Sequence, residues 1–239
     1  MIDWALVART LPEYWVGLRV SLLLLFVSCA TAFLLSIPLA MARVSRHAWL
    51  SWPVWAFTYV VRGTPLLVQL FMVYFGLAQF EVVRESAAWP MLRSAWFCAW
   101  LTFAINSTAY TTEIFAGALK NTPNGELEAA RSLGLSATQV YRRILWPGAL
   151  RRALPQYGNE VVMMMHATAI ASTVTLVELT RVARDVYYNY LAPVEAFGVV
   201  ATFYFALTYA MVGAFKLVEK RYLRHLAPRE TGPAAGRPT

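Results

Sequence analysis

Charged side chains are scarce in this sequence. Asp, Glu, Lys and Arg make up 14% of the 239 residues, whereas 59% of the residues are hydrophobic and the mean hydropathy is +0.49. Soluble domains carry about a quarter charged residues and need them to remain dissolved. The low charge therefore excludes a soluble enzyme, and the high apolar content excludes a disordered or collagen-like chain. The composition predicts an integral membrane protein.

Cysteine and phosphate-binding loops are also lacking. Cys29 and Cys98 fall inside apolar runs, and two cysteines so placed build neither a disulfide framework nor a metal cluster. No glycine-rich loop ends in Lys-Ser or Lys-Thr, so we expect ATP to be bound elsewhere. His47, His166 and His225 are far apart and have no paired acidic motif, which disfavours a membrane enzyme. No filter-like stretch or ring of charge indicates an ion channel. We expect this chain to hold no metal and no cofactor.

Five apolar stretches are long enough to cross a membrane, which takes about 20 residues. The first is too long for the apolar part of a signal peptide, so it is expected to stay uncleaved. In the second, Arg62-Gly63-Thr64-Pro65 predicts a break near the cytoplasmic end of the helix. The expected fold is all-α, with five transmembrane helices at about 16–42, 52–80, 94–119, 157–177 and 197–218.

Basic residues are distributed unequally between the two sides of such a fold. If the loop after the first stretch is cytoplasmic, 15 of the 21 Lys and Arg residues lie on the inner side and six lie outside. Cytoplasmic loops collect positive charge, so the N-terminus is predicted to be periplasmic and the C-terminus cytoplasmic. The same bias explains the net charge of +8 without a nucleic-acid partner. We therefore expect the protein to be in contact with membrane lipid.

The inner loop at 121–155 has the pattern of two short helices outside the bilayer. Thr122-Pro123 predicts a cap residue followed by the first residue of a helix, and Gly134 predicts its left-handed end. The stretch from Ser136 to Gln139 is typical of a capping box that begins the second helix, and Pro147 is predicted to close it. An ordered helical loop on the inner face favours docking of a partner. The alternative is an amphipathic helix that rests on lipid headgroups.

Several motifs resemble one family. Glu128-Ala129-Ala130-Arg131-Ser132-Leu133-Gly134, followed by Ile144-Leu145-Trp146-Pro147, resembles the EAA motif of ABC importer inner-membrane permeases, with Trp146 where an aliphatic residue is usual. The stretches Arg62 to Gln69 and Ala109 to Leu119 resemble the polar amino acid uptake branch. Asn159-Glu160-Val161-Val162, His166 and Ala183-Arg184-Asp185 look most like its M-type subunit for histidine, lysine, arginine and ornithine. The likeness runs from the first apolar stretch to about Pro228.

The resemblance implies a permease domain over residues 1–227 in the bacterial inner membrane, and the Pro- and Gly-containing tail at 228–239 is expected to be a disordered cytoplasmic end. It implies a transport subunit that moves basic L-amino acids from the periplasm to the cytoplasm and has no catalytic residues. Its partners would be a cytoplasmic ATPase dimer that binds ATP-Mg, a second permease subunit or a second copy of this chain, and a periplasmic amino-acid-binding protein. Opines and neutral polar amino acids are the alternative substrates.

The resemblance also assigns roles within the inner loop. In the family this loop is a coupling helix that sits in a groove of the ATPase. Small alanines let such a helix lie close to its partner, and a glycine permits the sharp turn that presents it. The expected coupling residues are Glu128, Ala129, Ala130, Leu133 and Gly134.

Polar residues inside the apolar stretches are the candidates for a substrate path, because charge at membrane depth usually faces protein or a cavity. Asn106, Tyr110 and Glu113 follow one face of the third stretch. Glu160 would attract a guanidinium or ammonium group. The predicted set is Asn106, Tyr110, Glu113, Glu160, His166 and Thr168. For the two glutamates the alternative is pairing with inner-face arginines or helix ends, and for His166 it is a hydrogen bond in the packing.

Overall fold

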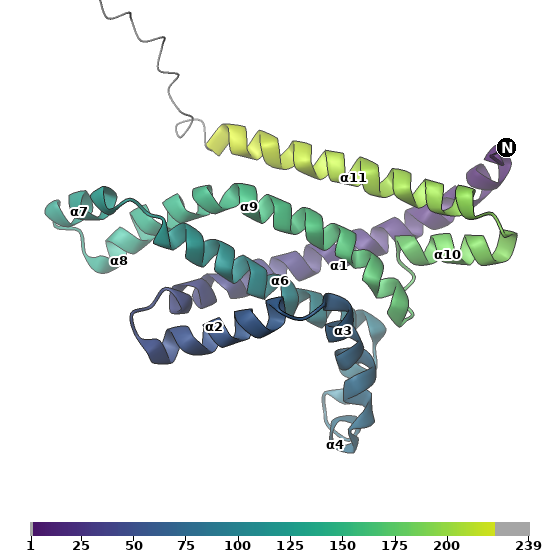
Figure 1. The fold of residues 1–239 in the computed structure, drawn as a ribbon, viewed down its shortest axis with the longest axis horizontal. Coiled ribbons are helices and arrows are strands. Elements are labelled where there is room, and N and C mark those ends of the chain that lie inside the picture. Colours follow the sequence, from purple (N-terminus) through teal and green to yellow (C-terminus); the bar gives the residue numbers. More distant parts are fainter. Residues whose placement is uncertain (1, 223–239) are drawn as a thin grey trace, which may run out of the picture.

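The chain is a layered array of long helices in the computed structural model, which describes residues 2–222 (Figure 1). No β-strand occurs in these residues, so the all-α prediction is confirmed. The tail predicted to be disordered, 228–239, lies outside the described residues. The long helices are α1 (Trp4–Arg43), α2 (Ala48–Arg62), α6 (Ala95–Lys120), α9 (Trp146–Ala167), α10 (Leu179–Tyr190) and α11 (Pro193–Tyr222), and the short ones are α3 (Leu66–Phe71), α4 (Glu81–Arg84), α5 (Trp89–Leu92), α7 (Asn124–Ser132) and α8 (Ala137–Val140).

Helices α1 and α6 form the centre of the array and pack against each other more extensively than any other pair. The buried face of α1 carries small residues, among them Ser28, Ala32 and Ser36, and α6 meets it with buried Ser, Thr and Ala residues. Small side chains allow two helices to approach closely, which suits a protein in lipid where burial of apolar surface drives little association. Larger side chains such as Leu24 and Phe103 fill the core where α9 joins the pair.

The second apolar stretch is broken as predicted, but more sharply than a simple kink. Helix α2 ends at Arg62, α3 begins at Leu66, and the two segments meet at 99°. The chain then continues through a π-helical turn at Met72–Gly76 and a 3₁₀ turn at Leu77–Gln79. Pro65 has no N–H to continue the α2 ladder, which is why the helix stops here.

One of our expectations for the inner loop is wrong, namely the end of its second helix at Pro147. Pro147 does not close a helix: it stands in the first turn of α9, which follows α8 through a π-helical segment at Tyr141–Leu145 without a break. A proline in a first turn removes no ladder bond, so it is tolerated there. Helix α9 therefore starts at Trp146, before the predicted span at 157–177, and continues as a 3₁₀ segment at Thr168–Val174.

Two of the described helices, α1 and α11, are each long and apolar enough to cross a membrane, and up to four spans result if each of two bent pairs is counted as one. These pairs are α2 with 66–79 and the run 137–174 with α10. Helix α6 is not among these candidates, and it carries many buried hydroxyls and Asn106. The count of five spans thus stays a prediction. Helices α7 and α8 lie at one end of the array, and the N-terminus and α10 lie at the other (Figure 1).

Candidate functional site

A hollow of about 220 Å³ with mostly apolar walls lies where α3, α6 and α9 meet. It brings together three of the residues predicted for a substrate path, Asn106, Tyr110 and Glu160, although Glu160 is far from the other two in sequence. Apolar side chains form the remaining wall. The lining residues are Leu66, Asn106, Tyr110, Glu160, Met163, Met164 and Ala167. Mixed walls of this kind hold a ligand that has both a polar head and an aliphatic stem.

The break between α2 and α3 helps to shape this hollow. The Gln69 amide nitrogen donates to the carbonyl oxygen of Val61 at 2.7 Å and to the Thr64 hydroxyl at 2.7 Å, so it satisfies backbone and side chain at the break. The Gln69 side-chain oxygen in turn accepts from Asn106 Nδ2 at 3.1 Å. One side chain therefore ties the broken helix to α6. The sequence analysis missed Gln69, and its place at the end of the Arg62 to Gln69 motif was the available signal.

Glu160 is the partly buried carboxylate of this hollow. Ser107 of α6 lies beside it, and the Arg62 guanidinium contacts the ring of Tyr110 in the same hollow. Glu160 takes part in neither of the two ion pairs that the described residues form. Its carboxylate oxygens therefore have acceptor capacity left for a cationic group.

Glu113 lies outside the hollow and has a different environment. Its Oε1 accepts from Arg43 Nε at 2.7 Å and from the Thr58 hydroxyl at 2.7 Å. The carboxylate thereby joins α1, α2 and α6, which is the arrangement that the alternative interpretation, pairing with an inner-face arginine, predicted. Both charged side chains are about four-fifths buried.

Replacing Glu113 with Gln is expected to lower the stability of the purified subunit by about 1–2 kcal/mol, because Arg43 would keep its charge in a partly buried place without a carboxylate. Thermal unfolding in detergent measures the change. Glu85→Gln, an exposed carboxylate, is the control and should leave the midpoint unchanged. Unaltered stability together with lost transport would instead make Glu113 part of the substrate path.

Most of the predicted coupling residues of the inner loop are exposed at the surface. Glu128, Ala129, Leu133 and Gly134 are exposed, Leu133 to 80%, whereas Ala130 is buried and holds α7 to the rest of the loop. Leu133 directly follows the last residue of α7, and its side chain is open to a partner. The arrangement suits a knob that docks into another protein.

The ends of this knob are well defined. Gly134 has φ +72°, Gly134 N–H donates to Arg131 O at 2.9 Å, and Leu135 N–H donates to Ala130 O at 3.2 Å. This is the Schellman arrangement, and it confirms the predicted left-handed end. The predicted capping box is confirmed too, with Ser136 and Gln139 bonded reciprocally.

Thr122 does not cap α7, which corrects our prediction. The helix begins at Asn124, with Pro123 at the capping position and no side-chain cap. The Thr122 hydroxyl instead donates to Leu119 O at 2.9 Å and accepts from Arg152 Nη2 at 2.6 Å. Arg152 Nε also donates to Ala118 O at 3.3 Å, so α9 holds the end of α6 where the loop begins. The Thr122 hydroxyl therefore bonds to Arg152, which is distant in sequence, instead of capping the helix that follows it.

Residues 32–229 match the family described as "Binding-protein-dependent transport system inner membrane component". The chain belongs to this family. It is 41% identical to the histidine/lysine/arginine/ornithine transport system permease protein HisM of Escherichia coli (strain K12), over 92% of this chain and 98% of that protein. It is 38% identical to the nopaline transport system permease protein NocM of Agrobacterium fabrum, over 98% and 97% of the two chains.

A solved structure, "Crystal structure of an amino acid ABC transporter with histidines", superposes with a TM-score of 0.83 at 30% sequence identity and covers 92% of this chain and 99% of the other. The fold is therefore that of an ABC importer permease, and the protein is a transport subunit rather than an enzyme. This confirms the family resemblance of the EAA-like motif and of the Arg62 to Gln69 stretch.

Like Glu113, two more of the predicted path residues of the permease lie away from the hollow. The exposed His166 ring faces α11, and its Nε2 is 3.0 Å from the Thr208 hydroxyl. The buried Thr168 hydroxyl donates to Met165 O at 2.7 Å, where α9 passes into its 3₁₀ segment. The structure thus separates His166 and Thr168 from Asn106, Tyr110 and Glu160.

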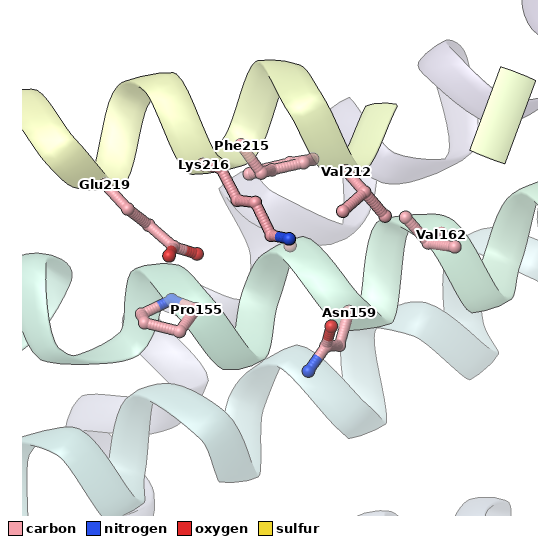
Figure 2. A pocket seen from close by; sticks show the side chains of 8 residues that line it. Pro155, Asn159, Val162, Val212, Phe215, Lys216 and Glu219 are labelled. Carbon is pink, nitrogen blue, oxygen red and sulfur yellow. The ribbon is translucent and has the colours of Figure 1, made fainter. Parts of the chain in front are cut away.

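A second hollow of the permease, about 230 Å³, lies between α9 and α11. Figure 2 shows Lys216 and Glu219 reaching from α11 toward α9, which carries Asn159. Asn159 and Glu160 are adjacent in the chain but line different hollows, because successive residues point to different sides of a helix. Gly158 packs under Phe215, where a Cβ would approach the ring to 2.9 Å, so α9 and α11 are in close contact here.

Sequence reasoning also missed Glu178, which is completely buried in the permease. It caps α10 by accepting from Thr180 N–H at 2.9 Å and Arg181 N–H at 2.8 Å. Hydroxyls of Ser21 on α1 and Tyr204 on α11 lie 3.4 Å from its Oε2. The carboxylate therefore joins three helices through hydrogen bonds, and its role is structural.

Proposed function

We propose that this permease moves basic L-amino acids, namely histidine, lysine, arginine and ornithine, from the periplasm to the cytoplasm as part of an ATP-driven importer. The observation that carries the proposal is the Glu160 carboxylate, which has no ion-pair partner in the described residues and lines a hollow with Asn106 and Tyr110. A cationic side chain would pair with Glu160, and Met163 and Met164 would contact its aliphatic stem. The name of the HisM relative supports the same class of substrate.

The proposed topology has five membrane spans in one permease domain over residues 1–227 of the inner membrane. The spans are α1, the broken α2 and α3 segment, α6, α9 with its 3₁₀ continuation, and α11. Helix α6 is included because its polar residues, such as Asn106 and Ser107, are buried in protein and do not face lipid. In this topology the N-terminus is periplasmic and the α7 knob cytoplasmic, which the excess of basic residues on one side supports.

The proposed complex contains three components in addition to this chain. A cytoplasmic ATPase dimer binds ATP-Mg, a second permease subunit or a second copy of this chain completes the path, and a periplasmic binding protein delivers the amino acid. Closure of the ATPases moves the α7 knob, through Glu128, Ala129, Ala130, Leu133 and Gly134, and this motion passes to the spans. The Schellman end, the capping box and the Arg152 contacts support the proposal, because a rigid knob transmits a rigid-body motion.

Uptake by the reconstituted complex tests this function. Vesicles that contain the permease, the ATPase and the binding protein should accumulate labelled arginine, lysine, histidine and ornithine only when ATP is present. Nopaline belongs in the panel because the NocM relative covers nearly the whole chain, and glutamine represents neutral polar amino acids. Uptake of nopaline or glutamine in preference to all four basic amino acids would overturn the substrate proposal.

A further inference from the structure

Arg62 places a cationic side chain against Tyr110, one of the residues that line the Glu160 hollow. It is the last residue of α2, and its guanidinium carbon lies 5.1 Å from the centroid of the Tyr110 ring. Tyr110 is itself a wall of the hollow, and Leu66, one turn past the break, is another. The exposed Arg62 side chain forms none of the ion pairs within the described residues. A cation over an aromatic face is held, but weakly enough to be displaced.

Two carboxylates lie near Tyr110, the ring that Arg62 contacts: Glu160 lines the same hollow, and Glu113 is three residues further along α6. Their situations differ, because Glu113 already pairs with Arg43 at 2.7 Å. Glu160 is therefore the one of these two carboxylates that forms no ion pair within the described residues. The fixed end of α2 keeps Arg62 in place, since the chain turns by 99° directly after it and Gln69 bonds the turn to α6 through Asn106.

We propose that Arg62 is a tethered cation that competes with a cationic substrate for the Tyr110 and Glu160 face of the hollow. The inference rests on the proposed function and adds a residue that sets how tightly the site binds. A carboxylate in a site of low dielectric binds a cation strongly, and a transport site must also release it. A guanidinium anchored beside the site weakens the bound state and reoccupies the Tyr110 face as the substrate leaves.

Direct binding to the purified permease–ATPase complex tests the proposal, with arginine and its neutral analogue citrulline as probes. Arg62→Gln should tighten arginine binding roughly three- to tenfold, as expected when one charge near a partly exposed site is removed, and change citrulline binding less than about twofold. Arg62→Lys keeps the charge and should restore the wild-type arginine affinity. Arg62→Met gives a second uncharged variant should the first fail to assemble. Arg46→Gln, also exposed on the inner side, is the matched control and should change nothing.

The outcomes separate this inference from the proposed function when Glu160→Gln is measured in parallel. If Glu160→Gln weakens arginine binding while the uncharged Arg62 variants leave it unchanged, the tethered cation is overturned and the proposed function stands. Equal tightening of arginine and citrulline would also overturn it, because the effect would then be steric. If Glu160→Gln leaves arginine binding unchanged, the proposed substrate site itself is overturned, whatever the Arg62 variants show.

Discussion

Glu128→Arg is expected to reduce ATP-driven uptake at least about tenfold while the permease remains in the membrane. Glu128 is exposed on α7, and its side chain takes part in no hydrogen bond or ion pair of the described residues, so the substitution removes nothing from the fold. Reversing a charge at a docking surface places like charges together, which costs several kcal/mol across an interface. Uptake into vesicles and co-purification of the ATPase are the two measurements.

The control for this prediction is Glu81→Arg, the same change at an exposed residue of α4, on the side predicted to be periplasmic. It should leave uptake intact. Gly134→Asp gives an independent test of the knob, since a side chain at φ +72° strains the turn although a Cβ there meets no atom within 4 Å. Wild-type uptake by Glu128→Arg and Gly134→Asp would contradict coupling through α7.

Glu160→Gln should lower the stimulation of ATP hydrolysis by arginine or lysine roughly tenfold and leave basal hydrolysis nearly unchanged. The substitution keeps the shape of the side chain and removes its charge, so a cationic ligand loses a charge-assisted hydrogen bond worth about 1.5–3 kcal/mol. Hydrolysis by the reconstituted complex, measured with and without substrate and binding protein, gives both values.

A matched control comes from the second hollow. Glu219→Gln changes the same group in the hollow between α9 and α11 and should leave stimulation intact (Figure 2). An equal loss of basal and stimulated hydrolysis in Glu160→Gln would show that this carboxylate supports the fold rather than the substrate. Loss of stimulation in Glu219→Gln alone would move the site to the other hollow.

Local patterns predicted several elements because the interactions that form them are also local. The apolar run at 94–119 predicted α6, Gly63 and Pro65 predicted the break after α2, and the capping box and the left-handed Gly134 followed from residues a few positions apart. The start of α9 could not be predicted this way. A proline can close one helix or begin the next, and only the path of the chain through 141–145 distinguishes the two.

The sequence predicted which types of residue form the candidate site, but it did not predict which individual residues belong to it. Gln69 and Glu178 were missed because their partners, Asn106 for one and Ser21 and Tyr204 for the other, lie far away along the chain. His166 was included on its position in an apolar stretch, but helix periodicity alone does not say whether a ring faces a hollow or a neighbouring helix. Its partner proved to be Thr208 of α11.

Composition and motifs were sufficient to establish a helical membrane protein of the permease family, because hydropathy and short motifs depend only on neighbouring residues. Tertiary structure alone decided which of two similar glutamates lines the hollow. Glu113 and Glu160 both lie in apolar stretches, and the difference between them arises from distant helices: α1 brings Arg43 to neutralise one, and α3 and α6 enclose a space beside the other. A carboxylate that already forms an ion pair binds a further cationic ligand only weakly.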